Sequence, residues 1–405
     1  MKKLAQLYIV MLTLGLNAQI EVTTLTPEFK GSGGLSLDDQ GNLIIADFGD
    51  FLNISDPDGL PNDIWELDSD LNLNLYSTGF VGASGNDFDS EDILFQSDIG
   101  ASSIYKIVNG TRTFVTSTGI VNPVGLVFDS NGDFYVCNCG NNTIRKVTPS
   151  GVSTQFASGT DFFCPNGITI DEDDNLYVSN FSNGNIIKID PSGTTTVLNS
   201  TPGGTTSGPS NGHLEYHEPT RTLFIASHGS NKIYALRIDD PSNLITIAGT
   251  GERGNADGDV SVATFSRPNG VAVTQTGDSI YVNSAVPVTN VPNRPLNPQL
   301  VRLITGVNSI LGVNDHLTQN EWELYPNPVH DMVTIEGYVR ADQYDNLSFK
   351  LFDLNGRLIL QKDGVEILDS RIRENIGMKK ITAGIYLFSL EAEGKQVFNG
   401  KIVKQ

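Results

Sequence analysis

The chain repeats one pattern of apolar and polar positions. Each copy starts at a glycine, alternates apolar and polar residues, passes a turn rich in Asp, Asn and Gly, and alternates again up to Asp, Asn or Ser. The copies span residues 34–47, 85–98, 125–138, 167–180, 212–227 and 270–283. Alternation with period two predicts β-strands, and a turn of this composition joins them in a hairpin. A hairpin that recurs six times predicts a repeat architecture.

Further strands complete each repeat. A third alternating segment follows most hairpins, as at 143–148 and 185–190, and a fourth follows a glycine turn. Four antiparallel strands per repeat are typical of a propeller blade. The last repeat lacks its fourth strand, and the segment 21–26 has the right alternation to supply it. We therefore expect this N-terminal strand to close the ring as the outer strand of blade six, which leaves no open sheet edge.

The repeat stops near residue 307 and a polar linker, 307–323, follows. Short alternating segments then run from 324 to 405, with Asn355-Gly356 as a hairpin signal. Several short strands in a segment of this length predict a small β-sandwich. The predicted fold class is all-β, with a six-bladed β-propeller over 19–306 followed by a small C-terminal β-sandwich over 324–405.

The first residues have the features of a secretory signal peptide. Two lysines precede an apolar run from Leu4 to Leu16, and a small residue, Ala18, stands at a plausible cleavage point. The alternative is a membrane anchor, but the run is shorter than the ~20 apolar residues that a spanning helix needs. We expect cleavage of residues 1–18 and a mature chain without a transmembrane segment.

Charge is unevenly distributed. The chain has 26 basic and 47 acidic residues, for a net charge of −21, whereas the segment after residue 323 is neutral. No Lys or Arg stands between Lys30 and Lys106. Such a field repels nucleic acid and attracts cations. Two interpretations stay open for the acidic residues and for the oxygen-rich insertion at 47–63: a solvated surface, or a site for Ca²⁺ or another divalent cation.

The repeat also predicts where a binding site lies. In a propeller, the first strand of each blade begins and the second ends at the same face, so residues at both positions should ring the channel mouth, where concave sites on loops usually lie. The two rings are Gly33, Ser84, Val124, Asn166, Asn211 and Asn269, and Asp47, Asp98, Asn138, Asn180, Ser227 and Asn283. The predicted binding residues are Asn138, Asn166, Asn180, Asn211, His228, Asn269 and Asn283; no catalytic residue is predicted.

Cysteines and histidines add two expectations. Cys139 ends one hairpin and Cys164 precedes the next, so adjacent blades place them at the same face, and we predict a disulfide. A free thiol is the alternative, and Cys137 competes for the same partner. His213 and His217 flank Glu215 on an extended strand and turn rather than a helix, so we expect surface or loop histidines and no zinc-protease motif.

Two resemblances concern the propeller. The segments 142–147, 246–259 and 263–273 resemble NHL-repeat propellers, which implies the fold over 21–305 but no single function, because such propellers include binding platforms, lyases and lactonases. Pro-Asn-Gly at 165–167 and 268–270 resembles gluconolactonase-like propellers, in which the asparagine binds a divalent cation. This implies a metal site formed by Asn166, Asn211 and Asn269 with Asp47 or Asp98. That family's first-blade glutamate is Gly33 here, and a simple turn into the strand is the alternative.

The C-terminal segment resembles the sorting domain of the type IX secretion system. The matching elements are Tyr325-Pro-Asn-Pro, 351–357, 383–388 and the ending 400–404. The resemblance implies export across an outer membrane, with the secretion translocon as the partner of residues 324–405.

The preferred function is therefore that of a secreted or cell-surface binding protein, with a small molecule, glycan or protein as its unknown ligand. The alternative is a divalent-metal-dependent hydrolase of the gluconolactonase type. A third possibility is an interaction platform that uses a propeller face.

Overall fold

The computed structural model describes residues 20–50, 61–202, 209–287, 295–307, 323–338, 347–353, 357–365, 367–368, 371–392 and 395–405. The chain forms two compact units, 1–311 and 312–405. The predicted signal peptide lies outside the described residues, as do positions 308–322 of the predicted linker and most of the 47–63 insertion. None of the described residues forms a helix long and apolar enough to cross a membrane.

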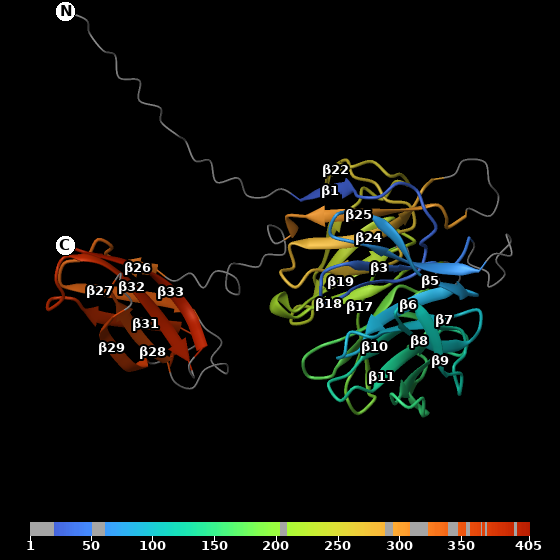
Figure 1. The fold of residues 1–405 in the computed structure, drawn as a ribbon, viewed down its shortest axis with the longest axis horizontal. Helices are drawn as coiled ribbons and strands as arrows, with labels where there is room; N and C mark the ends of the chain where they lie inside the picture. The colour runs from blue at the N-terminus through green and yellow to red at the C-terminus, as the bar shows by residue number, and fades with distance from the viewer. Residues whose placement is uncertain are drawn as a thin grey trace, which may run out of the picture. The chain divides into compact units, whose positions relative to one another are not determined.

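The described residues of the first unit form six antiparallel sheets, the blades of a β-propeller (Figure 1). From the channel outward, blade one consists of β2 (Leu35–Leu37), β3 (Leu43–Ala46), β4 (Asn62–Leu67) and β5 (Leu73–Phe80). Blade two consists of β6 (Ala83–Phe88), β7 (Leu94–Asp98), β8 (Ser103–Val108) and β9 (Thr111–Thr116). Blade three consists of β10 (Pro123–Phe128), β11 (Phe134–Asn138), β12 (Thr143–Val147) and β13 (Ser153–Ser158). Blade four consists of β14 (Pro165–Ile170), β15 (Leu176–Asn180), β16 (Asn185–Ile189) and β17 (Thr195–Ser200). Blade five consists of β18 (Leu214–His217), β19 (Thr222–Ser227), β20 (Lys232–Arg237) and β21 (Leu244–Ala248).

Blade six joins the two ends of the propeller sequence. It contains β23 (Val271–Val273), β24 (Ser279–Ala285), β25 (Gln299–Thr305), the N-terminal β1 (Glu21–Thr24) and β22 (Gly258–Asp259). β1 pairs antiparallel with β25, so the predicted closure by the N-terminal strand is confirmed. β1 is not the outermost strand, however, because β22 pairs along its free edge. The innermost strands contact one another in the order β2, β6, β10, β14, β18, β23 and back to β2, so the ring is closed.

Aspartates fix the turn of the inner hairpins. In blade three, Asp129 Oδ1 accepts hydrogen bonds from the backbone N–H groups of Asn131 and Asp133, both at 3.0 Å. Asp38, Asp89 and Asp171 make the same pair of contacts in blades one, two and four. A side-chain acceptor for turn N–H groups stabilises the tight reversal. Part of the excess of acidic residues in the propeller is therefore explained by their role in stabilising turns.

Apolar side chains of neighbouring blades pack face to face. One buried cluster combines Tyr135 and Ile144 of blade three with Ile168, Leu176 and Val178 of blade four. Each sheet thus buries both faces against its neighbours, which holds the six inner strands around the central channel.

In two of the six repeats, the strand pairing differs by one residue from the one expected when the repeats are aligned on their glycines. In blade three Leu126 faces Val136, whereas in blade six Val271 faces Val282, so the blade-six turn holds one extra residue. Ser284, not Asn283, therefore occupies the position of Asn138. In blade five Leu214 faces Ile225, so the residue at the glycine position is His213.

The described residues of the second unit form two four-stranded antiparallel sheets. Their strands are β26 (Glu323–Tyr325), β27 (Met332–Tyr338), β31 (Arg371–Gly377) and β30 (Ile367–Leu368), and β29 (Leu358–Val365), β28 (Leu347–Phe352), β32 (Gly384–Ala392) and β33 (Lys395–Lys404). Val333 and Ile372 of one sheet share a buried core with Phe349 and Phe388 of the other. The predicted β-sandwich is therefore present.

Candidate functional site

The mouth of the propeller channel contains a cavity of about 110 Å³, here called the mouth cavity. It is lined by Ser32, Phe48, Ser84, Ile99, Val124, Cys139, Cys164, Asn166, Phe181, His228, Arg267, Asn269, Leu296 and Gln299. Ser84, Val124, Asn166 and Asn269 are positions just before the repeat glycines. That ring thus reaches the mouth, as the repeat predicts for these four positions.

The two Pro-Asn-Gly asparagines join neighbouring blades. Asn166 Nδ2 donates to the carbonyl of Asn211 at 2.9 Å, and Asn269 Nδ2 donates to the carbonyl of Ser32 at 2.7 Å. Each amide N–H group thus bonds to the backbone that enters the next blade. These contacts give the asparagines a structural role at the edge of the cavity, whatever else they bind.

Residues at the ends of the second strands make hydrogen bonds to the backbone of their own blade. Asp98 accepts hydrogen bonds from the N–H groups of Val81 and Gly82, each at 3.0 Å, and Asn138 donates to the carbonyl of Gly119 at 2.8 Å. Asn180 similarly donates to the carbonyl of Asp161 at 2.7 Å. These side chains hold the loop that enters their own blade, and none of them lines the mouth cavity.

Asn211 and Asn283 are also occupied within the fold. Asn211 accepts from Thr201 Oγ1 at 2.6 Å and donates to the carbonyl of Gly184 at 2.9 Å. Asn283 donates to the carbonyls of Gly31 and Gly33 at 2.7 and 2.8 Å, which joins blade six to blade one. Both lie off the predicted ring because of the one-residue shifts described above.

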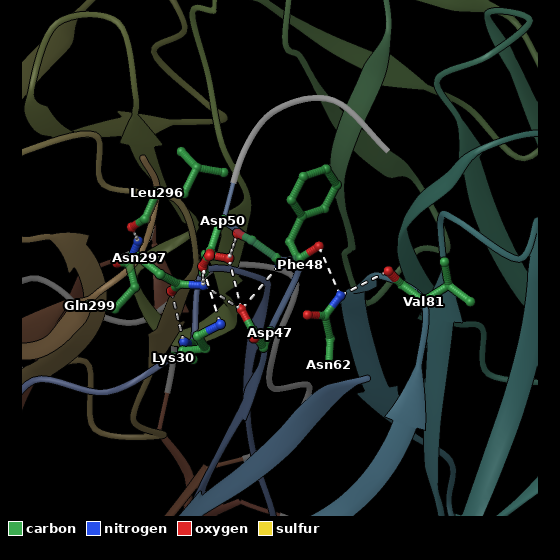
Figure 2. Close-up of polar contacts among 12 residues, drawn as sticks. Lys30, Asp47, Phe48, Asp50, Asn62, Val81, Leu296, Asn297 and Gln299 are labelled. Carbon is green, nitrogen blue, oxygen red and sulfur yellow. Dashed lines mark hydrogen bonds and ion pairs between the residues drawn. The ribbon is translucent and has the colours of Figure 1, made fainter. Parts of the chain in front are cut away.

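Asp47 is held in a polar network beside the mouth (Figure 2). Its Oδ1 accepts from Asn297 Nδ2 at 2.9 Å, Ser32 Oγ at 3.1 Å and Gly49 N at 3.1 Å. Burial raises the pKa of this carboxyl, and the three hydrogen bonds partly offset that effect. Asp50 accepts from the same Asn297 amide at 3.2 Å.

The five predicted metal ligands do not all line one cavity. Asn166 and Asn269 line the mouth cavity, whereas Asp47, Asp98 and Asn211 do not. Across the described parts of the chain, no group of three or more His, Cys, Asp and Glu side chains is placed to hold a metal ion. The residues at the mouth therefore do not fit the cation site of gluconolactonase-like propellers.

His228 is the most unusual side chain of the mouth cavity. It is 4 % exposed, and neither ring nitrogen has a hydrogen-bond partner. Its ring lies 5.9 Å from that of Phe181, centroid to centroid. Burial lowers the pKa of His228 to about 3, and the charges of Arg267 and Arg253 add to this effect. The neutral imidazole thus offers one donor and one acceptor to a ligand.

The blade-five histidines are not at the surface, although His213 and His228 lie in loops next to their strands, as expected. His213 and His217 are 8 % and 3 % exposed, and His228 is equally buried. His217 is held by Thr220 Oγ1 at 2.8 Å and by the carbonyl of Gln275 at 2.9 Å. Packing between blades buries these positions, which a hairpin considered alone would leave at a surface.

The predicted disulfide between Cys139 and Cys164 is present, with an S–S distance of 1.97 Å. It links blades three and four, and both cysteines line the mouth cavity. Cys137 is a buried free thiol. One part of the cavity wall is thus covalently fixed.

A second cavity of about 50 Å³ lies deeper in the channel and is called here the channel chamber. It is lined by Leu35, Ser36, Asn86, Asp87, Gly125, Leu126, Val127, Ile168, His213, Leu214, Glu215 and Val271. These residues come from all six innermost strands or their first turns. The sequence pattern did not single out this chamber, because the prediction considered only the mouth.

Comparison with protein families covers both units. Residues 323–405 match the secretion system C-terminal sorting domain, and residues 121–147 match the NHL repeat. The first unit is thus a β-propeller that contains an NHL repeat, and the second unit is a C-terminal sorting domain. This tail assigns it to export by the type IX secretion system, to the cell surface or the medium. No curated protein matches the sequence.

Solved structures with the same propeller fold are distant in sequence. An auxiliary nutrient binding protein from Bacteroides ovatus is 17% identical, with 71% of this chain and 76% of that chain covered and a TM-score of 0.52. A gluconolactonase from Xanthomonas campestris is 14% identical, with 72% and 92% covered and a TM-score of 0.51. A Bacteroides thetaiotaomicron protein of unknown function is 13% identical, with 71% and 76% covered and a TM-score of 0.54. At these identities the NHL propeller shares their fold, and nothing about its ligand follows.

Proposed function

We propose that this exported propeller binds a small organic anion with an apolar group in its mouth cavity, without converting it chemically. The observation that carries the proposal is the composition of the lining. The chain has a net charge of −21, yet no described lining residue is Asp or Glu, and one is Arg267. In an acidic protein, a lining of this composition favours an anionic ligand at that place.

The apolar wall defines the rest of the ligand. Phe48, Ile99, Phe181 and Leu296 line the cavity beside the disulfide. A volume of about 110 Å³ fits a single ring or a short aliphatic chain rather than a large molecule. Apolar walls with a few convergent polar groups are typical of small-molecule sites.

The buried imidazole supports binding independently of charge. A buried polar group without a partner is costly, and native proteins rarely leave both nitrogens of a histidine unsatisfied. A ligand that bonds to His228 removes this cost. We therefore expect an anion that is held by Arg267 and also hydrogen-bonds to the imidazole.

The test is a calorimetric titration of the purified exported protein with benzoate, phenylacetate and hexanoate, each paired with its neutral amide. We expect the carboxylates to bind more tightly than their amides. Arg267→Gln should weaken carboxylate binding by about tenfold or more, because a charge-assisted hydrogen bond is lost. The matched control is Arg237→Gln, which makes the same charge change at β20, where Arg237 pairs with Asp239. Equal binding of acids and amides, or equal loss in both variants, contradicts the proposal.

The alternative hydrolase function has less support. A metal-dependent lactonase needs carboxylate ligands or a carboxylate base, and the described lining residues of the mouth cavity include neither. Lactone hydrolysis with added Ca²⁺ tests this alternative directly. Turnover above the uncatalysed rate that is lost in Asn166→Ala would replace binding by catalysis as the function.

A further inference from the structure

Blade five breaks the symmetry of the channel. Five blades have glycine at the first inner position, namely Gly34, Gly85, Gly125, Gly167 and Gly270, and blade five has His213. A Cβ atom built on Gly34 or Gly85 would lie 3.3 or 3.0 Å from His213 Cε1. In the closed ring, blade two faces blade five, so the imidazole crosses the channel. It lies at the level between the mouth cavity and the channel chamber.

Two carboxylates face each other across the chamber. Asp87 on β6 and Glu215 on β18 stand at equivalent positions of opposite blades, two residues beyond the glycine level. Both keep a little accessible surface because they border the chamber, and no Lys or Arg is among its described lining residues. Burial raises the pKa of Asp87 to about 7 and that of Glu215 to about 8, and the charge of Asp87 adds to the effect on Glu215.

Three polar atoms of the chamber lining lack a partner. They are Ser36 Oγ, Asn86 Oδ1 and His213 Nε2. Asn86 and His213 are each only 8 % exposed. A buried polar atom without a hydrogen bond costs about 1–3 kcal/mol, so three around one small space point to an occupant that satisfies them.

We propose that the channel chamber is a binding site for one hard divalent cation. The carboxylates of Asp87 and Glu215 supply its negative charge, and Asn86 Oδ1 and Ser36 Oγ supply neutral oxygen. Carboxylate, amide and hydroxyl oxygens are the donors that such cations prefer. Water fills the remaining coordination positions, because two acidic side chains are among the described lining residues and a volume of about 50 Å³ admits an ion with one or two waters. His213 Nε2 bonds to one of these waters.

This site is independent of the proposed function. The mouth cavity and the channel chamber share no lining residue. The cation site also differs from the predicted set of Asp47, Asp98 and the three asparagines, none of which lines the chamber.

The experiment measures ion uptake by the full exported protein. The protein is stripped with EDTA, dialysed, and titrated separately with Ca²⁺, Mg²⁺ and Mn²⁺ by calorimetry, and its metal content is determined. We expect one ion per chain for at least one of the three metals. Asp87→Asn and Glu215→Gln keep the side-chain shape and should each weaken binding by about tenfold or more, because a charged ligand is lost. Asp47→Asn is the control and should bind the ion as the unchanged protein does.

Three results overturn the proposal: no uptake of any of the three ions, uptake that both chamber variants retain, or uptake that is lost in Asp47→Asn instead. If the chamber variants fail to fold, anomalous scattering from crystals of the unchanged protein soaked in Mn²⁺ decides. A peak between Asp87 and Glu215 supports the site. Its absence, or a peak elsewhere only, refutes it. Failure of carboxylate binding at the mouth leaves each of these readouts unchanged.

Discussion

The mouth cavity and the channel chamber are built from the same inner strands, but their chemistry is opposite. The mouth has Arg267, a neutral His228 and apolar walls, whereas the chamber has Asp87 and Glu215 facing each other. Along the inner strands, the residues that line the mouth cavity and those that line the channel chamber are only a few positions apart. A repeated hairpin therefore fixes where side chains point, and single departures from the repeat decide what each level can bind.

The first inner glycines of the blades, which separate the two cavities, should be the positions where substitution lowers stability most. A Cβ atom at Gly85 would lie 2.6 Å from the carbonyl oxygen of Val124 and 3.0 Å from His213 Cε1. Gly85→Val should therefore destabilise the propeller by about 3 kcal/mol or more, or prevent folding, because backbone of the next blade cannot yield. Thermal melting followed by circular dichroism measures this loss. Gly377→Ala, at a strand position with no atom within 4 Å, is the control and should melt normally.

As pH falls, His228 of the mouth cavity and Glu215 of the channel chamber should change the free energy of unfolding in opposite directions. The pKa of His228 is lowered from 6.5 to about 3, so the unfolded chain gains a proton first as pH falls below 6.5, and stability is lost. The pKa of Glu215 is raised from 4.5 to about 8, so the folded chain holds its proton first, and stability rises as pH falls from 8 towards 4.5.

Denaturant unfolding between pH 9 and pH 4, with EDTA present, separates these contributions. His228→Gln should remove about 3 kcal/mol of the stability loss between pH 7 and pH 4. Glu215→Gln should stabilise the protein relative to the unchanged chain more at pH 8 than at pH 5. If the free energy of unfolding depends on pH in the same way in both variants and in the unchanged chain, the two cavities do not differ as described.

The mouth is also cross-linked, whereas the chamber is not. The disulfide joins residues separated by 25 positions. Replacing Cys139 and Cys164 together by Ser should lower stability by about 3 kcal/mol, because the unfolded chain regains the entropy of that loop. Thermal melting of the double variant measures the loss, and a reductant should then have no further effect on it. Cys137→Ala removes the free thiol and should leave the response of the protein to reductant unchanged.

Closure of the ring at mouth level depends on Asn283 and less on Ser284. Asn283 bonds to the carbonyls of Gly31 and Gly33 and accepts from Gly270 N at 2.6 Å, whereas Ser284 bonds within its own blade to Ser266. Asn283→Ala should cost about 2 kcal/mol, since buried backbone groups lose their partners, and Ser284→Ala about 1 kcal/mol. Urea unfolding of the two variants compares them. Equal losses would mean that the shifted register has no energetic consequence.

Much of the fold could be predicted because its signals are local. Alternation, turn residues and glycine spacing gave six blades and the closing strand at 21–26, each of which depends on short stretches of sequence. The site was predicted less well, because its residues depend on register. Asn283 was assigned to the mouth since its copy has the same length as the others, although one residue had moved into the turn. Aligning blade five on the apolar Leu214 instead of Gly212 would have placed His213 in the channel.

The sequence by itself determined the propeller and the export tail, because each follows from a repeated pattern or short motifs, whereas the pairing of Cys139 with Cys164 was decided by the structure. Only the tertiary structure decided which polar residues face a cavity. Asp47, Asp98 and Asn138 are polar residues at equivalent ends of the repeat, as Asn166 and Asn269 are at its start, yet their side chains hold loops within the fold. Asp87 and Glu215 are far apart in sequence and meet only because blades two and five stand opposite each other in a closed ring of six. Closure is a property of all the strands together, so no single segment encodes that encounter.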